Sequence, residues 1–194
     1  MVDGSVGWSG TIDGMNSSND AAPVASPDHD AAIAMWQAYV EHRGGARVDD
    51  ADYTVEHFGD TAGLADELLD IVLSGRKRAT AELVSEFAHR GDPLPRIGSH
   101  WIACDSTGAP RIIIRSVALR IGPFGSADAA FAFAEGEDDR TLESWQREHR
   151  RYWERTTAAR GAVWSESEEI VFEHFAVVWP PEHADGHVPV RPVP

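Results

Sequence analysis

The order of the apolar patterns along the chain limits its fold more than any other feature. Between 61 and 75, leucines and valines recur at helical spacing, and so do the aromatic residues that follow Asp30. The segments 100–105 and 111–121 instead have the β-branched character of strands. Helical and strand patterns are mixed without a regular strand–helix–strand alternation. The sequence therefore predicts an α+β fold with a largely antiparallel sheet.

Four further elements complete the expected order. The sequence predicts a short strand at 53–58, a short helix capped near 126–128, a long helix at 141–160 and a last strand at 170–179. An acidic segment precedes the long helix, where we expect Asp138 or Asp139 to cap the helix rather than to bind a metal.

Length and composition indicate one folded domain between two tails. The 194 residues, 42% of them hydrophobic, suffice for one buried core. Residues 1–29 and 180–194 are rich in small and polar residues or proline, so we expect a disordered leader, a domain at 30–179 and a disordered tail. The chain has one cysteine, Cys104, and no apolar run of membrane-spanning length. We expect a cytoplasmic protein with no membrane partner; the sequence leaves its oligomeric state open, a dimer included.

The charge distribution disfavours long-range attraction to nucleic acid. The net charge is −15, and nearly all the acidic excess lies in the flanks, because 61–160 holds 14 basic and 15 acidic residues. An acidic surface steers a polyanion away. A small ligand in a locally basic pocket remains compatible with this distribution.

Lys77 is the only lysine of the chain; the other sixteen basic side chains are arginines. It lies in the segment Gly75-Arg76-Lys77-Arg78-Ala79-Thr80, here called the lysine loop, directly after the helix at 61–75. An arginine stays protonated in proteins, whereas a lysine can lose its proton. The lone lysine therefore suggests amine chemistry. Two simpler explanations stay open. The lysine can stand there by chance, or the cations Arg76, Lys77 and Arg78 can be placed there by attraction to the negative end of the preceding helix.

A second group of polar residues surrounds the start of the long helix. It comprises Glu135-Gly136-Glu137-Asp138-Asp139-Arg140, here called the acidic loop, and the helix residues Trp145 and His149. Trp145, His149 and Trp153 share one helix face, which is typical of packing against a sheet. His149 is predicted to be either a pocket residue or a hydrogen-bonded core histidine.

Taken together, these segments resemble the ASCH domain family, whose fold is related to the RNA-binding PUA barrel. The resemblance rests on the lysine loop, on Pro95-Arg96-Ile97-Gly98 before a strand, and on the acidic loop followed by Leu142, Trp145 and His149. It covers about 30–179. It implies a small PUA-like, mainly antiparallel β-barrel with flanking helices, and a cleft lined by the two loops.

The resemblance also implies candidate functions. Family members are variously RNA-binding modules, a ribonuclease, and a small amidohydrolase that deacylates N4-acetylcytidine. In the amidohydrolase the reacting groups match Lys77, Thr80 and Glu137 by position, with Glu135 as the alternative acid. An amidohydrolase acting on a nucleoside-like amide is the first hypothesis; a ribonuclease and a non-catalytic RNA-binding module are the alternatives. The expected ligand is a nucleoside or a short RNA, and no cofactor or metal is expected.

Each matching residue has an expected role in amide hydrolysis. Thr80 would be the nucleophile or would orient a water. Lys77 would accept the hydroxyl proton if Arg76, Arg78 and burial lower its pKa. Glu137 would orient the amine or carry the proton. The expected substrate-binding residues are Arg76, Arg78, Glu135, Arg140, Trp145 and His149. Arg78 departs from the usual loop pattern, and its extra charge would favour a phosphorylated or acidic ligand.

Overall fold

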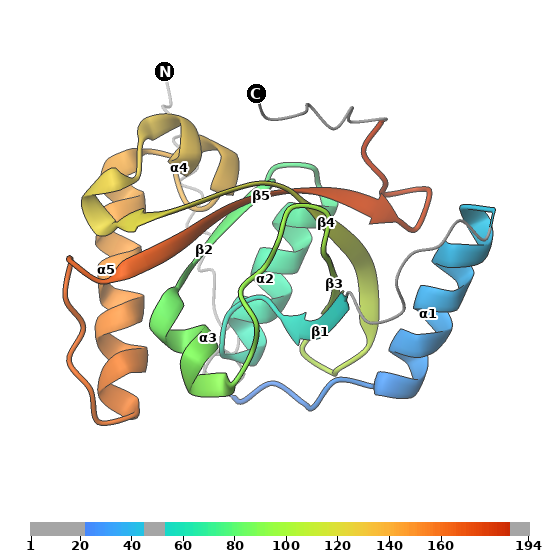
Figure 1. The fold of residues 1–194 in the computed structure, drawn as a ribbon, viewed down its shortest axis with the longest axis horizontal. Coiled ribbons are helices and arrows are strands. Elements are labelled where there is room, and N and C mark those ends of the chain that lie inside the picture. Colours follow the sequence, from blue (N-terminus) through green and yellow to red (C-terminus); the bar gives the residue numbers. More distant parts are fainter. Residues whose placement is uncertain (1–21, 45–52, 187–194) are drawn as a thin grey trace, which may run out of the picture.

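The structure, a computed structural model, describes residues 22–44 and 53–186 (Figure 1). Within them the elements follow in the order α1 (His29–His42), β1 (Tyr53–His57), α2 (Ala62–Leu73), β2 (Ala79–Leu83), α3 (Val84–Arg90), β3 (His100–Cys104), β4 (Pro110–Pro123), a short 3₁₀ turn (Phe124–Ser126), α4 (Ala129–Glu135), α5 (Leu142–Ala159) and β5 (Glu169–Trp179).

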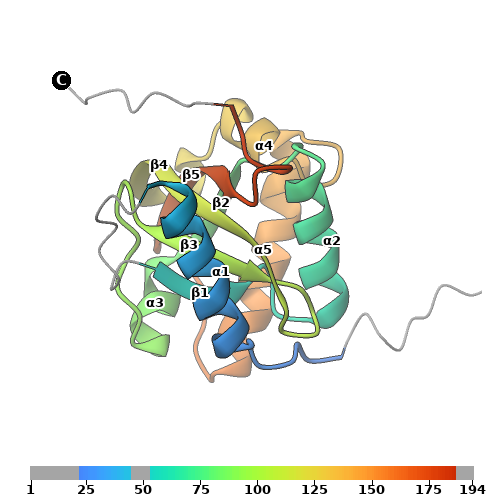
Figure 2. The ribbon, with the colours of Figure 1, turned by 90° about the vertical axis from the view of Figure 1, so that its right-hand side faces the viewer.

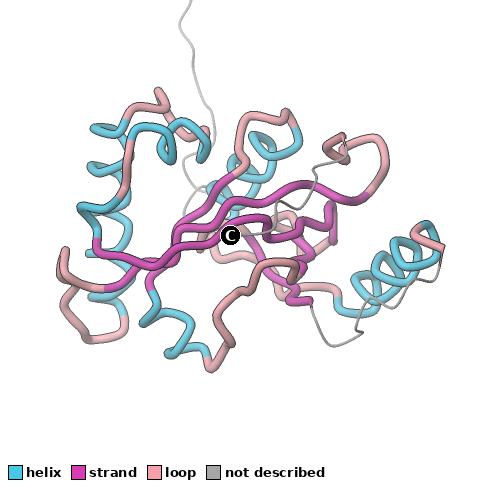
Figure 3. The backbone as a smooth tube through the Cα atoms, turned by 45° about the horizontal axis from the view of Figure 1, so that its top comes forward, coloured by secondary structure: helices cyan, strands magenta, loops and turns pink. Residues whose placement is uncertain are grey.

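The five strands form one curled sheet in the order β1-β3-β4-β5-β2. Only β1 and β3 pair in parallel; the other three pairs are antiparallel. The long strands β4 and β5 run side by side through the centre, and the sheet curls into a half-barrel (Figure 3). The predicted α+β, PUA-like and mainly antiparallel fold is confirmed, with β1 and β2 as the two edges of the described sheet.

Helices cover both faces of the sheet (Figures 1 and 2). Trp36 and Tyr39 of α1 pack on Ile102 and Ile113, whereas Leu69 and Val72 of α2 pack on the other face. At the opposite end from α1, α4 and α5 pack on β2 and the start of β5 in a third apolar cluster. The α2 helix covers the face to which Phe175 and Val177 of β5 point. The part of that face nearer the start of β5 is left for the cleft.

Most predicted elements lie where the patterns placed them. Thr61 caps α2 by accepting a hydrogen bond from the Leu64 N–H, as its position before the apolar stripe suggests. The expected cap of the long helix is wrong: Thr141 is the N-cap of α5, and Asp139 accepts hydrogen bonds from Thr141 itself. The elements β2 and α3 were not predicted.

The domain extends beyond its predicted limits at both ends. The backbone of Ala25 and Asp28 bonds to the β3–β4 turn, and Asp185 accepts hydrogen bonds from the Arg78 guanidinium and the Val177 N–H. Residues 22–29 and 180–186 therefore belong to the folded unit. The predictions for 1–21 and 187–194 fall outside the described residues. None of the described helices is long and apolar enough to cross a membrane.

Candidate functional site

A large cleft of about 1290 Å³ opens on the face of the sheet that α2 leaves uncovered. Its walls come from β1, β2, β5, α3 and α5, together with the loop before β3. Aromatic side chains, among them Phe58, Trp101 and Tyr152, line it beside many polar groups. This volume exceeds that of many small-molecule sites, so the cleft has room for a ligand of nucleoside size.

Lys77 is a buried cation behind the cleft wall, in contact with two acids that line the cleft but not itself among the lining residues. Its side chain is 1% exposed, and its Nζ lies 2.5 Å from Glu137 Oε1 and 3.6 Å from Glu135 Oε1. Glu135 is equally buried, whereas Glu137 is 25% exposed, and both line the cleft. The lysine loop and the acidic loop are thus brought together, as the resemblance implies.

The close approach of the two loops depends on the backbone. The Arg78 N–H donates to the Ala134 carbonyl oxygen, 2.8 Å away. Gly136 ends α4 with φ +74°, and a Cβ there would collide with the carbonyl oxygen of Arg76. A glycine in the left-handed region is therefore required where the loops touch.

The pKa of Lys77 is shifted in the direction opposite to the one expected from the sequence. Burial alone lowers the pKa of Lys77, but the carboxylates of Glu137 and Glu135 outweigh it, and the pKa is raised. The expected lowering by Arg76 and Arg78 is wrong because both guanidinium groups turn away, Arg76 to the Asp138 carbonyl oxygen and Arg78 to Asp185. Lys77 is an ammonium in the resting site.

Glu135 and His149 form the second layer of this cluster. His149 Nε2 lies 3.4 Å from Glu135 Oε2, and the Trp145 indole N–H donates to the same oxygen. Burial raises the pKa of Glu135, but Lys77 and His149 overcome this and the pKa falls below its usual value. Burial lowers the pKa of His149, but Glu135 reverses the direction and raises it. Glu135 thus favours the charged forms of both Lys77 and His149, whereas Lys77 opposes protonation of His149.

Thr80 reaches the cleft because β2 alternates. Ala79 and Leu83 are buried in the core, and Thr80 and Glu82 point to the other side and line the cleft. Thr80 pairs with Glu173 of β5 across the strands. Directly paired residues carry their side chains on the same face, so Thr80 and Glu173 are neighbours on the cleft floor.

The other predicted binding residues lie behind the cleft rather than in it. Among the described residues that line the main cleft, Arg76, Arg78, Arg140 and Trp145 do not occur. Arg140 donates to the Phe133 carbonyl oxygen and lies 3.5 Å from the centre of the Phe133 ring. Trp145 is 4% exposed and packs in the core.

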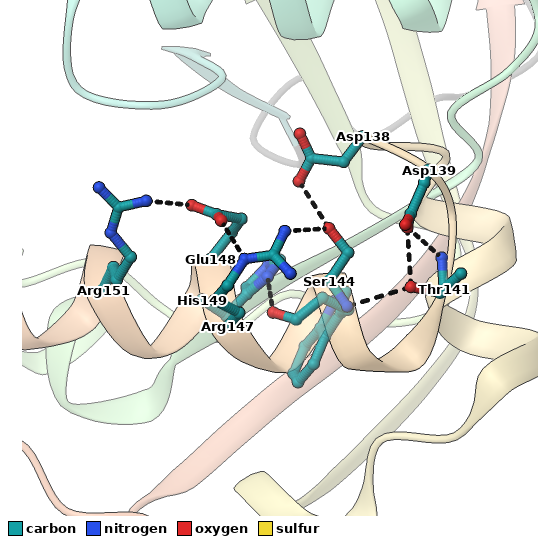
Figure 4. A network of polar contacts seen from close by, with 9 residues as sticks. Asp138, Asp139, Thr141, Ser144, Arg147, Glu148, His149 and Arg151 are labelled. Carbon is teal, nitrogen blue, oxygen red and sulfur yellow. Dashed lines mark hydrogen bonds and ion pairs between the residues drawn. The ribbon is translucent and has the colours of Figure 1, made fainter.

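Polar contacts hold the acidic loop on the start of α5 (Figure 4). The Ser144 hydroxyl donates to Asp138, and Asp139 bonds Thr141. One turn later His149 stacks on Trp145 with ring centroids 4.2 Å apart, and its ring faces both the cleft and the buried cluster. His149 therefore lies at the pocket and is also a hydrogen-bonded core histidine, which are the two alternatives that the sequence left open.

Two functional candidates were not recognised in the sequence. Glu173 and Ser116 lie on the cleft floor, and the Ser116 hydroxyl donates to Glu173 Oε1. The predicted alternation at 170–179 places Glu173 on one face with Val171 and Phe175. An acid between two apolar residues on an inward face is the signal that could have identified it.

A curled, mainly antiparallel sheet with flanking helices and a cleft on one sheet face defines a small PUA-like domain. The model of the ASCH domain family matches residues 54–179, about two thirds of the chain, and the chain belongs to this family.

Solved structures support the assignment. The chain is similar to the ASCH domain from Lactobacillus crispatus JV V101, with a TM-score of 0.67 and 24% identity over 77% of this chain and 94% of that one. It is also similar to protein EF3133 from Enterococcus faecalis V583, with a TM-score of 0.68 and 27% identity over 77% of this chain and 88% of that one. No match was found among curated proteins.

Proposed function

We propose that the cleft binds a nucleoside-like ligand and hydrolyses an amide bond of it, such as that of an N4-acylated cytidine. The observation that carries the proposal is the Lys77–Glu137 pair, with an Nζ–Oε1 distance of 2.5 Å, whose carboxylate lines the same cleft as Thr80. A hydroxyl, a carboxylate and a buried ammonium are the groups that acyl transfer requires.

The raised pKa of Lys77 changes the roles first expected. Glu137, partly exposed to the cleft, is the better proton acceptor, since the Lys77 ammonium has no lone pair to offer. The Thr80 oxygen, or a water that it orients, attacks the acyl carbon, and its proton passes to the Glu137 carboxylate. Lys77 holds that carboxylate in place, Glu135 holds Lys77, and His149 contacts Glu135. Breaking the C–N bond then requires a proton on the leaving nitrogen.

The charge of the cleft favours hydrolysis of a nucleoside-like amide over the two alternatives that involve RNA, a ribonuclease and an RNA-binding module. Eight carboxylate side chains and four arginines line it. Three of those arginines pair with acids of the same wall: Arg90 with Glu82, Arg151 with Glu148 and Arg155 with Asp60. An RNA backbone would meet a net negative surface, whereas a neutral nucleoside would not.

Replacement of one acid tests the proposal. Glu137→Gln keeps the shape of the side chain but removes the proton acceptor. We expect turnover of N4-acylated cytidine to fall by about 10²-fold or more with KM little changed. Glu143→Gln, an exposed acid of α5, is the control and should retain full turnover. The measurement is release of cytidine by chromatography.

Parallel assays distinguish the alternatives. Cleavage of a short RNA by the wild type, lost in Glu137→Gln, would establish the ribonuclease instead. RNA binding without cleavage of either substrate would establish a binding module. Equal turnover by Glu137→Gln and the wild type would contradict the catalytic role of this site.

A further inference from the structure

Glu173 is a buried acid of the cleft that the reaction so far leaves unused. It lies on β5, its residue is 8% exposed, and it faces the cleft directly beside Thr80. An ionisable group in such a position is costly to bury unless it is paired or uncharged. The hydrogen-bond and ion-pair partners of Glu173 therefore indicate what role it has in the cleft.

One hydroxyl is the only partner of Glu173 in the described part of the chain. The Ser116 hydroxyl donates to Oε1, and Ser99 Oγ lies 3.3 Å from Ser116 Oγ in a short chain of hydroxyls. A bulge in β4 after Ser116 interrupts its pairing with β5 at this point. The second oxygen of Glu173, Oε2, has no hydrogen-bond or ion-pair partner among these residues, so a carboxyl oxygen is left for a ligand.

The buried Glu135 and the partly exposed Glu82, two other acids of the cleft, are satisfied differently. Glu135 has Lys77, His149 and the Trp145 indole, while Glu82 accepts from the Leu83 N–H and the Trp153 indole. Within residues 22–44 and 53–186 no cation pairs with Glu173, and the charged group that acts on it is another acid, Glu56 of β1. Burial raises the pKa of Glu173, and Glu56 adds to it while Ser116 opposes it. The cleft thus holds two buried acids whose pKa values are shifted in opposite directions, that of Glu135 downward and that of Glu173 upward.

We propose that Glu173 is the general acid that protonates the leaving nitrogen of the amide. The inference rests on the proposed amide hydrolysis at Thr80 and Glu137. Its geometric basis is the cross-strand pairing, because the carbonyl carbon that Thr80 attacks and the nitrogen that leaves are bonded neighbours in the substrate. A carboxyl beside Thr80, with one oxygen taken by Ser116 and the other facing the cleft, fits that nitrogen.

The proton transfers balance over one cycle. Thr80 Oγ bonds to the acyl carbon and its proton passes to Glu137. The C–N bond breaks, its electron pair stays on nitrogen, and the Glu173 proton joins it, so the amine leaves neutral. Water then attacks the acyl-Thr80 ester and gives its proton to Glu173. The C–O bond to Thr80 breaks, and Thr80 recovers its proton from Glu137. The net change is amide plus water to acid plus amine.

His149 is another titratable group of the cleft, but its ring nitrogens are occupied. Nε2 faces Glu135 at 3.4 Å, and Nδ1 lies 3.1 Å from the Trp145 carbonyl oxygen. A donor already engaged on both sides is poorly placed to protonate a ligand. Glu173 has a free oxygen and His149 has no free nitrogen.

The test compares leaving groups. A poor leaving group such as the cytidine amine needs protonation, whereas 4-nitrophenolate leaves without it. Glu173→Gln retains the volume and an oxygen for Ser116 but cannot donate a carboxyl proton. We expect the first-turnover release of cytidine from N4-acetylcytidine, which reports acylation of Thr80 alone, to slow by about 10²-fold or more. The first-turnover release of 4-nitrophenolate from 4-nitrophenyl acetate should change by less than about threefold. Glu169→Gln, an exposed acid at the start of the same strand, is the control for both substrates.

The outcomes separate this inference from the function on which it rests. Equal losses of the first-turnover rate on both substrates, or no loss on the amide, would overturn the role of Glu173 as the acid while leaving the hydrolase intact. A wild type that cleaves neither substrate would overturn both. Glu173→Asp, which keeps a carboxyl, should recover part of the amide activity. That recovery would be absent if Glu173 only supported the fold.

Discussion

Lys77 combines a compact positive charge with almost complete burial, and the space around it explains why it is a lysine. The ammonium fits between Glu135 and Glu137 with 1% of its side chain exposed. A guanidinium is larger and planar, and its fork would need more room than two carboxylates at a loop contact leave. The presence of a single lysine beside sixteen arginines is thus explained by its pairing with two carboxylates and by the small size of the ammonium group. Deprotonated amine chemistry, suggested by the sequence, is opposed by the raised pKa of Lys77.

Removal of the Lys77 charge should destabilise the folded protein. In Lys77→Met, Glu135 stays buried without its nearest cation, so we expect the free energy of unfolding to fall by about 3–5 kcal/mol. Urea unfolding followed by fluorescence measures it. The double variant Lys77→Met/Glu135→Gln should recover part of the loss, because the unpaired acid is then neutral. A single variant as stable as the wild type would show that the pair contributes nothing to folding.

Individual residues of the site differ in how far the sequence reveals them. Lys77, Thr80 and Glu137 are recognisable because motif spacing preserves them, and the first and last do meet in the structure. The directions of the neighbouring side chains are set by distant contacts. Arg78, for example, turns to Asp185, more than a hundred residues away, and no local pattern predicts such a contact.

Among the elements, Arg78 joins four segments of the chain. Its guanidinium donates to the carbonyl oxygens of Val72 at the end of α2 and of Lys77, and to Asp185, which also accepts from the Val177 N–H of β5. The forked group satisfies carbonyls that the helix end leaves open. The expected role of Arg78 in binding an anionic ligand finds no support in this arrangement.

Arg78→Lys separates the two roles. It keeps the charge but loses the fork, so we expect unfolding free energy to fall by about 1–2 kcal/mol, a modest value because the ion pair is partly exposed. Affinity for an acylated cytidine should be unchanged, as titration calorimetry would show. A large loss of affinity at unchanged stability would show instead that Arg78 contributes to ligand binding.

The two elements that sequence patterns missed share a physical cause. The strand β2 reads Ala-Thr-Ala-Glu-Leu, with little of the β-branched and aromatic content typical of strands, and its partner β5 lies far along the chain. The helix α3 has only seven residues, too few for a helical period to stand out from the sequence. Long elements with a buried face, such as α2 and α5, are predictable because burial requires that pattern.

Across the whole molecule, charges are paired locally although the net charge is −15. Exposed arginines of α5 face acids from other segments, Arg150 with Glu166 and Arg155 with Asp60. Such pairs stabilise little but cancel the field that a row of arginines would project. The helix that carries most arginines is therefore a poor track for a phosphate backbone.

This charge arrangement predicts how the protein responds to salt. We expect no measurable binding of a single-stranded RNA of about 12 nucleotides near physiological salt, and affinity for an acylated cytidine that is unchanged between about 50 and about 200 mM salt. Fluorescence anisotropy with labelled RNA and calorimetry with the nucleoside measure the two. A neutral ligand releases no condensed counterions, so its affinity has no steep salt term. Binding of RNA with a log–log salt slope of several times about −0.7 would instead mean that several phosphates are neutralised, and the cleft would then serve a polyanion despite its acids.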